Sequence, residues 1–106
     1  MNRAFTPLAA GTKRLAATST SARIALAKSD EPEIEITNDG PDPVYVEVGT
    51  SSVTATAPVA AGAAGSYPIL AGQSKVIRNI RKGTYIAAIC DTGDTADVFF
   101  SSGEGE

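Results

Sequence analysis

Residues 33–48 read Glu-Ile-Glu-Ile-Thr-Asn-Asp-Gly-Pro-Asp-Pro-Val-Tyr-Val-Glu-Val and contain the clearest strand pattern in the chain. Both of its ends alternate apolar and polar residues, which is typical of a strand that buries one face and leaves the other in water. The residues between them, from Asn38 to Pro43, are turn formers. The stretch therefore predicts two neighbouring strands joined by a turn.

Further strands are predicted on both sides of this pair. Alternation indicates strands near residues 23–27, 74–78 and 95–100, separated by turn formers. Residues 84–90 are apolar throughout, which predicts a strand buried on both faces. No stretch has helical spacing over a useful length. We therefore predict an all-β, single-domain β-sandwich, jelly-roll or immunoglobulin-like, with about seven or eight short strands within residues 21–100.

The remaining segments are predicted to lie outside the sandwich. Residues 1–20 are rich in Ala, Thr and Ser, and we interpret them as an extended N-terminal arm that is not needed for folding, with a disordered terminus as the alternative. Residues 101–106 are interpreted as a flexible acidic tail. Small residues fill positions 49–66, where either residues 53–56 form a short edge strand or the whole segment is a functional excursion, the interpretation we favour.

Composition excludes several classes of function. A net charge of −3 argues against a nucleic-acid binder, which normally has a clustered basic face. The chain has no histidine and a single cysteine, so no internal disulfide is possible and we expect no metal, no cofactor and no catalytic site. Neither a signal peptide nor an apolar run long enough for a bilayer follows Met1, so we expect synthesis in a cytoplasm and no membrane partner.

Three groups of residues have alternative interpretations. Asp91, Asp94 and Asp97 surround a glycine as a calcium loop would, but their spacing departs from an EF-hand, and turn formers on a solvated strand explain them more simply. Cys90 ends an apolar strand, so we interpret it as a small core residue and not as a reactive thiol. The three tyrosines form either a sugar-binding platform or ordinary sheet positions; they are Tyr45, Tyr67 and Tyr85.

Two sets of residues are candidates for contact with a protein partner. In the arm, Phe5, Pro7 and Leu8 suit an extended segment laid onto another subunit. Between two predicted strands, Arg78, Arg81 and Lys82 form either a salt-bridge patch for an acidic partner or a solubilising turn.

The order of motifs resembles a known group of proteins. Residues 36–56, then Pro-Ile-Leu-Ala-Gly at 68–72, then Thr-Tyr-Ile-Ala-Ala-Ile-Cys-Asp at 84–91 follow one another as in small virion proteins encoded among the head genes of tailed bacteriophages. Residues 18–26 are also similar to them. The resemblance extends over about residues 18–100, which is the size of one sandwich domain.

This resemblance implies a capsid decoration or cement protein without cofactor or active site. Such a protein binds the outer surface of the shell formed by the major capsid protein, often as a trimer around a threefold axis, and stabilises the head. The resemblance thus implies a location on the virion after assembly in a bacterial cytoplasm. Similar proteins form head–tail connectors and tail components, and a free carbohydrate-binding β-sandwich is a second alternative.

Overall fold

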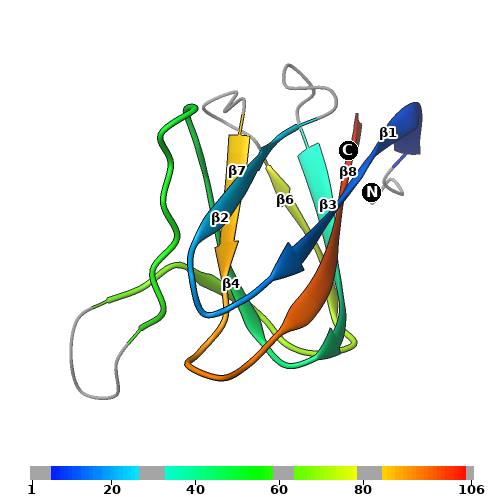
Figure 1. Ribbon diagram of the computed structural model, residues 1–106. Coiled ribbons are helices and arrows are strands. Elements are labelled where there is room, and N and C mark those ends of the chain that lie inside the picture. The colour runs from blue at the N-terminus through cyan, green and yellow to red at the C-terminus, as the bar shows by residue number, and fades with distance from the viewer. Residues whose placement is uncertain (1–5, 27–32, 59–63, 79–84, 105–106) are drawn as a thin grey trace.

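The chain folds into two stacked antiparallel sheets (Figure 1). The computed structural model describes residues 6–26, 33–58, 64–78 and 85–104, with the backbone alone for residues 6–10 and 104. Sheet A contains, in spatial order, β1 (Thr6–Ala17), β8 (Ala96–Glu104), β3 (Glu33–Pro41) and β6 (Ser74–Arg78). Sheet B contains β2 (Ala22–Ala25), β7 (Tyr85–Ile89), β4 (Val44–Gly49) and β5 (Tyr67–Ile69).

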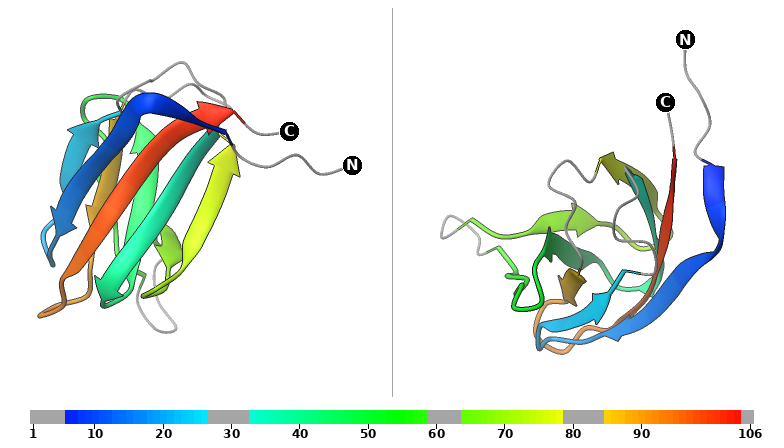
Figure 2. Two further views of the ribbon diagram at one scale, coloured as in Figure 1. Left: turned by 90° about the vertical axis from the view of Figure 1, so that its right-hand side faces the viewer. Right: turned by 90° about the horizontal axis from the view of Figure 1, so that it is seen from above.

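The strand order is that of a jelly roll. The first strand pairs with the last in sheet A, and the second pairs with the seventh in sheet B. Figure 2 shows the four strands of sheet A side by side and, from above, the two sheets facing each other. An immunoglobulin sandwich would instead place its first two strands next to each other in one sheet. The predicted β-sandwich is confirmed, and of its two predicted forms the structure has the jelly roll.

The alternation in residues 33–48 builds the centre of the core. Ile34 and Ile36 of β3 are fully buried, as are Val44 of β4 and Phe100 of β8. Their polar neighbours along each strand face outward, because successive side chains of a strand point to opposite faces. Burial of each such large side chain contributes about 1.5–3 kcal/mol to folding. These residues therefore hold the two sheets together.

Strand β7 is buried on both of its faces, as the sequence predicts. Ile86, Ala87 and Ala88 are all fully buried. Ala88 faces the core opposite Val46, whereas Ala87 lies opposite Glu47 and Arg23 and so faces outward from sheet B. An outward-facing residue with no exposed surface must be covered by another segment of the chain.

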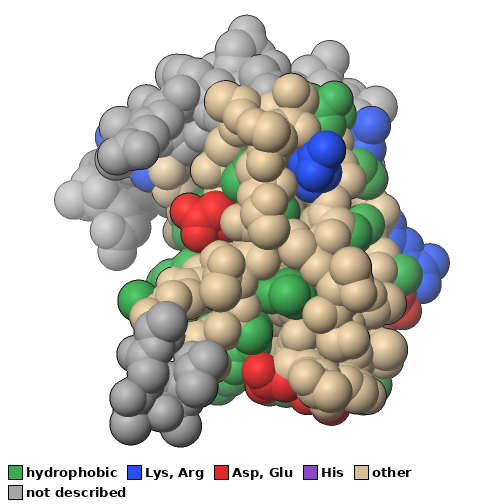
Figure 3. All heavy atoms as spheres, turned by 60° about the vertical axis from the view of Figure 1, so that its left-hand side comes forward, with side chains coloured by type: hydrophobic (Ala, Val, Ile, Leu, Met, Phe, Trp, Pro, Cys, Tyr) green, Lys and Arg blue, Asp and Glu red, His purple; other side chains and the backbone are tan. Residues whose placement is uncertain are grey.

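That cover is the segment that follows β4. The backbone N–H of Ala55 donates to Ser21 Oγ at 2.9 Å, and the Ser66 hydroxyl donates to Glu47 Oε1 at 2.9 Å. These two bonds attach the segment to both sides of β7, and Ala55 is itself buried. Its two limbs meet where Gly65 lies so close to Pro58 that a side chain at position 65 would clash. Residues 53–58 therefore do not form the predicted edge strand, and the functional role of residues 49–66 stays a prediction. Residues 53–58 form a lid over sheet B, on the side of the molecule that Figure 3 brings forward.

The segment predicted as an N-terminal arm forms the first strand of the sandwich from residue 6 onward. Residues 6–17 form β1, and residues 12–17 pair continuously with β8 of the same chain. Ala17 is buried in the core, and Leu15 packs against it. The predicted domain boundary at residue 21 is therefore wrong, because the sandwich includes β1. An irregularity between Pro7 and Thr12 shifts the register, which explains why no simple alternation marks this strand.

The predicted acidic tail is wrong for residues 101–104. These residues extend β8, where Ser101 lies opposite Glu35 and Ser102 lies opposite Ile34. Ser102 and Gly103 are both buried. Small residues at these positions allow the last part of β8 to run between β1 and β3. Among the residues that the structure describes, there is no helix that is long and apolar enough to cross a membrane.

Ser102 offers a test of this arrangement. Its hydroxyl is fully buried and has no hydrogen-bond partner among the described residues. Because an unpaired buried hydroxyl costs free energy, we expect Ser102→Ala to raise the free energy of unfolding by about 1 kcal/mol in urea denaturation. Ser101→Ala is the matched control, since the Ser101 hydroxyl bonds Thr12 Oγ1 at 2.8 Å on the exposed face and its loss should be neutral or slightly destabilising. A loss of stability in Ser102→Ala would show that the hydroxyl has a partner.

Candidate protein-binding surface

Four connecting loops meet at one end of the sandwich, which we call the acidic end. They are residues 18–21, 70–73, 90–95 and the turn between β3 and β4, which we take together with the last residues of β3 as residues 38–43. Backbone hydrogen bonds join them in pairs: Cys90 to Thr18, Asp42 to Thr95, and Gly72 to Asn38. These loops hold Asp39, Asp42, Asp91 and Asp94 but no Lys or Arg. This end of the molecule is therefore electronegative.

A buried asparagine organises the acidic end. Asn38 is fully buried, and its Nδ2 donates to the carbonyl oxygens of Asp42 at 2.8 Å and Ile69 at 2.9 Å. Its Oδ1 accepts from the N–H of Gly40 at 2.8 Å. The left-handed backbone of Gly40, with φ of 86°, turns the chain so that this bond can form. One side chain thus links β3 in sheet A to the start of β4 and the end of β5 in sheet B.

The loop from β5 to β6 presents an exposed leucine on this rigid frame. Leu70 is 55% exposed, although its backbone is fixed on both sides. The Leu70 N–H donates to Gln73 Oε1 at 3.0 Å, and the Gln73 N–H donates to the Leu70 carbonyl at 3.0 Å. In the same loop, the Gly72 N–H donates to the Asn38 carbonyl at 2.8 Å. Leu70 is therefore held outward in a fixed turn.

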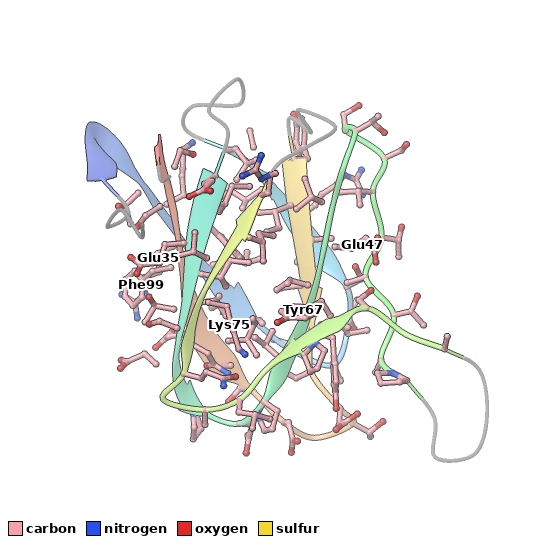
Figure 4. All side chains as sticks on the ribbon, turned by 180° about the vertical axis from the view of Figure 1, so that it is seen from behind. Glu35, Glu47, Tyr67, Lys75 and Phe99 are labelled. Atoms are coloured by element: carbon pink, nitrogen blue, oxygen red, sulfur yellow. The ribbon has the colours of Figure 1, made fainter. Side chains whose placement is uncertain are left out.

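Three large apolar residues among those that the structure describes are exposed, and two of them share one flank of the sandwich. The third, Val76 in β6, is 46% exposed but lies opposite Glu35, so it faces the outer side of sheet A. Tyr67 in β5 is 47% exposed, and Leu70 directly follows that strand. We call Tyr67 and Leu70 the apolar strip, which lies on the flank formed by β5, an edge strand of sheet B. In Figure 4, Tyr67 and Lys75 lie between β5 and β6 on this flank, whereas Glu35 and Phe99 lie on the outer side of sheet A.

The negative charge of the acidic end acts on two groups beside it. Partial burial, and then the charge and hydrogen bond of Asp91, raise the pKa of Tyr45 above its ordinary value; the Tyr45 hydroxyl donates to Asp91 Oδ2 at 3.3 Å. Burial raises the pKa of the Cys90 thiol to about 11, and the carboxylates of the acidic end add to the rise. Both shifts have the sign expected near clustered carboxylates.

Cys90 is a buried core residue, as predicted from the apolar strand that it ends. With a pKa of about 11, roughly a thousandth of the thiol is ionised at pH 8. We expect a thiol reagent such as dithiobis-nitrobenzoate to label the folded protein at pH 8 at least about 100-fold more slowly than the urea-unfolded chain. Equal rates in buffer and in urea would contradict the buried position of Cys90.

The strand edges are built against pairing with another chain. β1 contains an irregularity, and Lys13 stands on its core-facing side opposite Phe100. Lys75 takes the corresponding position on β6, opposite the buried Ile36. β5 is three residues long and contains Pro68, and β2 has four residues. Inward-pointing charges, irregularities, prolines and short strands all oppose edge-to-edge association. A partner is therefore expected to bind through side chains and not by adding a strand to either sheet.

The outer face of sheet A is largely satisfied within the chain. Arg14 bonds Asp97 with 3.0 Å between Nη2 and Oδ2, and its guanidinium lies 5.7 Å from the centre of the Phe99 ring. Thr37 Oγ1 and Ser74 Oγ are 3.0 Å apart in a further cross-strand hydrogen bond. These contacts pair several of the polar groups of this face with one another. We therefore place the candidate surface at the apolar strip and the acidic end.

The structure does not bring the predicted contact residues together. Pro7 and Leu8 lie in β1, at the edge of sheet A opposite to the one formed by β6, where Arg78 is exposed. Arg78 is paired in register with Glu33. Phe5, Arg81 and Lys82 lie outside the described residues.

The alternative interpretations of the aspartates and tyrosines also depend on position. The Asp94 N–H donates to the Asp91 carbonyl in a turn, and Asp97 is bonded to Arg14, so the three aspartates serve a turn and a strand face. Within the described part of the chain, no three acidic or sulfur ligands are grouped to hold a metal.

Tyr45 and Tyr85 lie near opposite ends of the ladder between β4 and β7, and Tyr67 lies opposite the core-facing Val46. The tyrosines thus do not share one platform.

A small hollow of about 120 Å³ lies near the acidic end, between residues 16–18, 40–41 and 95–97. Sites for drug-sized ligands usually measure about 300–1,000 Å³. The hollow is lined mainly by alanine and proline carbon atoms and offers few polar groups to orient a ligand. It does not suggest a small-molecule site.

Comparison with known proteins finds similarity at the level of structure and not of sequence. No protein-family model matches the chain, and no curated protein matches its sequence. A solved structure described as "Bacillus endospore appendages form a novel family of disulfide-linked pili" superposes with a TM-score of 0.48 at 14% sequence identity, over 96% of this chain and 90% of that one.

Proposed function

We propose that the protein is a non-enzymatic structural subunit of a tailed-bacteriophage virion, of the capsid decoration type. It binds the outer surface of the shell formed by the major capsid protein and stabilises the head. The sequence resemblance to proteins of phage head genes supports this proposal. The observation that carries it is the apolar strip, because large apolar side chains gathered on one exposed segment mark protein-binding surfaces.

The architecture suits a subunit that binds as a rigid body. The Asn38 bonds and the paired loops fix the acidic end, and the lid over β7 closes the outer face of sheet B. A surface that is fixed before binding loses little conformational freedom when it docks. From the resemblance alone we further propose that the protein acts as a trimer on the shell.

Reconstitution on empty heads tests the proposal. Heads of the encoding phage, grown with this gene disrupted, are mixed with the purified protein and sedimented. We expect saturable co-sedimentation, with density spread over the whole shell in negatively stained particles. Density confined to a single vertex would instead identify a head–tail connector, and density along the tail a tail component. Absence of binding to any part of the particle would refute a virion role.

A further inference from the structure

We propose that Leu70 and the acidic end form the docking site, and that its occupant is a protein surface with an apolar hollow rimmed by Lys and Arg side chains. This inference rests on the proposed function, under which the occupant belongs to the major capsid protein. It goes further by naming the surface that binds, its central residue and the chemistry of its complement.

The shape of the turn makes Leu70 an anchor. Its side chain is more than half exposed, yet five hydrogen bonds hold the loop around it, including those made by Gln73 and Asn38. An apolar side chain on a backbone that is already fixed loses less conformational freedom when it is buried on docking. Such anchors fill pockets at the centre of interfaces.

The surroundings of Leu70 determine the charge of the partner. Asp39 and Asp91 are exposed, Asp42 and Asp94 are half-buried, and the four loops contain no cation. Complementary potentials favour encounter and suppress association of like-charged surfaces. A second copy docking through the same end would bring two sets of four aspartates together. The charge therefore selects a basic partner and not a copy of this chain.

Tyr67 extends the apolar contact up the flank from Leu70. Its side chain is nearly half exposed, and it belongs to β5, the strand that leads into the Leu70 turn. Lys75 lies on the same flank between β5 and β6 (Figure 4), so the acidic character is confined to the end of the sandwich. The partner's hollow should continue as an apolar shelf on that side.

Binding of variants to the empty heads tests the inference. We expect Leu70→Ser to weaken binding by about 10–30-fold, as loss of a central anchor does. We expect the double variant Asp39→Asn with Asp94→Asn to weaken binding by a smaller factor and to flatten its dependence on NaCl concentration. The charge control is Glu33→Gln with Glu35→Gln, which removes two charges from the outer face of sheet A and should leave both affinity and salt dependence unchanged. Circular dichroism and melting temperature verify that each variant is folded.

The outcomes separate this inference from the proposed function. If the unmodified protein does not bind heads, the proposed function fails. If it binds, and Leu70→Ser binds equally well, the docking site is wrong while the function stands. Binding that strengthens with rising NaCl would likewise overturn the basic partner. A dimer in sedimentation velocity that dissociates in Leu70→Ser would show that the strip joins copies of this chain, which also overturns the proposal.

Discussion

Replacing Asn38 with aspartate is expected to lower the free energy of unfolding by about 3 kcal/mol or more at pH 7. The change keeps the shape of the side chain but removes both hydrogen atoms that Nδ2 donates to the carbonyls of Asp42 and Ile69. It also places a charge at a position with no solvent exposure, against two carbonyl oxygens. For a domain whose total stability is on the order of 5–15 kcal/mol, this loss is large.

The pH dependence of this variant identifies the cause. The new carboxyl is buried without a cation, so its pKa in the folded state lies above that in the unfolded chain. The folded state then binds protons more tightly, and its stability relative to the unmodified protein falls as pH rises through this range. We therefore expect the loss in free energy of unfolding, relative to the unmodified protein, to be smallest near pH 4 and to grow toward pH 7. Urea denaturation at several pH values measures it.

Two control variants show whether the buried charge or the lost hydrogen bonds destabilise Asn38→Asp. Asp39→Asn alters the neighbouring, exposed residue and should change stability by less than about 0.5 kcal/mol. Asn38→Ala removes the same hydrogen bonds without adding a charge, so it should be destabilising at every pH without the steep pH dependence. A mild, pH-independent effect of Asn38→Asp would mean that this side chain does not hold the sheets together.

The core strands could be predicted because their environment repeats along the chain. Strands β3 and β4 each bury one face, so Ile34, Ile36, Val44 and Val46 alternate with polar residues. Strand β7 is apolar throughout because the lid covers its second face. The sequence indicates that both faces are buried, but it does not indicate which segment covers the second one. Pattern therefore identifies burial, and only tertiary structure identifies the neighbour.

The binding surface could not be predicted in the same way. Leu70 looks like any apolar residue beside a turn, and its exposure depends on how Asn38, far away in sequence, fixes the loop. Similarly, the four aspartates of the acidic end are spread over two loops that only the fold brings together. A leucine directly before the turn residues Ala-Gly-Gln is the local signal that the sequence offers.

Strand β1 was missed because its inward positions are unusual. Lys13, Leu15 and Ala17 face the core side in turn, so only one of the three is a large apolar residue. Edge strands often contain such residues, which prevent aggregation and at the same time obscure the alternation. Because β1 belongs to the sandwich, the structure reverses the expectation that the domain folds without its first residues.

A chain that begins at Thr18 is expected not to fold. It lacks β1, so β8 becomes an unprotected edge and the core contacts of Leu15 and Ala17 are lost. Loss of these contacts and of a whole strand ladder should exceed about 5 kcal/mol, which is comparable to the stability of a small domain. A chain that begins at Thr6 retains every described strand and should show an unchanged circular-dichroism spectrum and urea midpoint.

Adjacent point variants test the same strand without truncation. Ala17 is buried, whereas its neighbour Ala16 is exposed opposite Asp97 on the outer face of sheet A. Ala17→Lys forces an ammonium group toward the core and should lower the free energy of unfolding by about 3 kcal/mol or more. Ala16→Lys places the same group in water beside a carboxylate and should be neutral. If residues 1–20 were instead an arm outside the sandwich, both variants would be equally harmless, so a difference in urea midpoint between them decides whether β1 belongs to the fold.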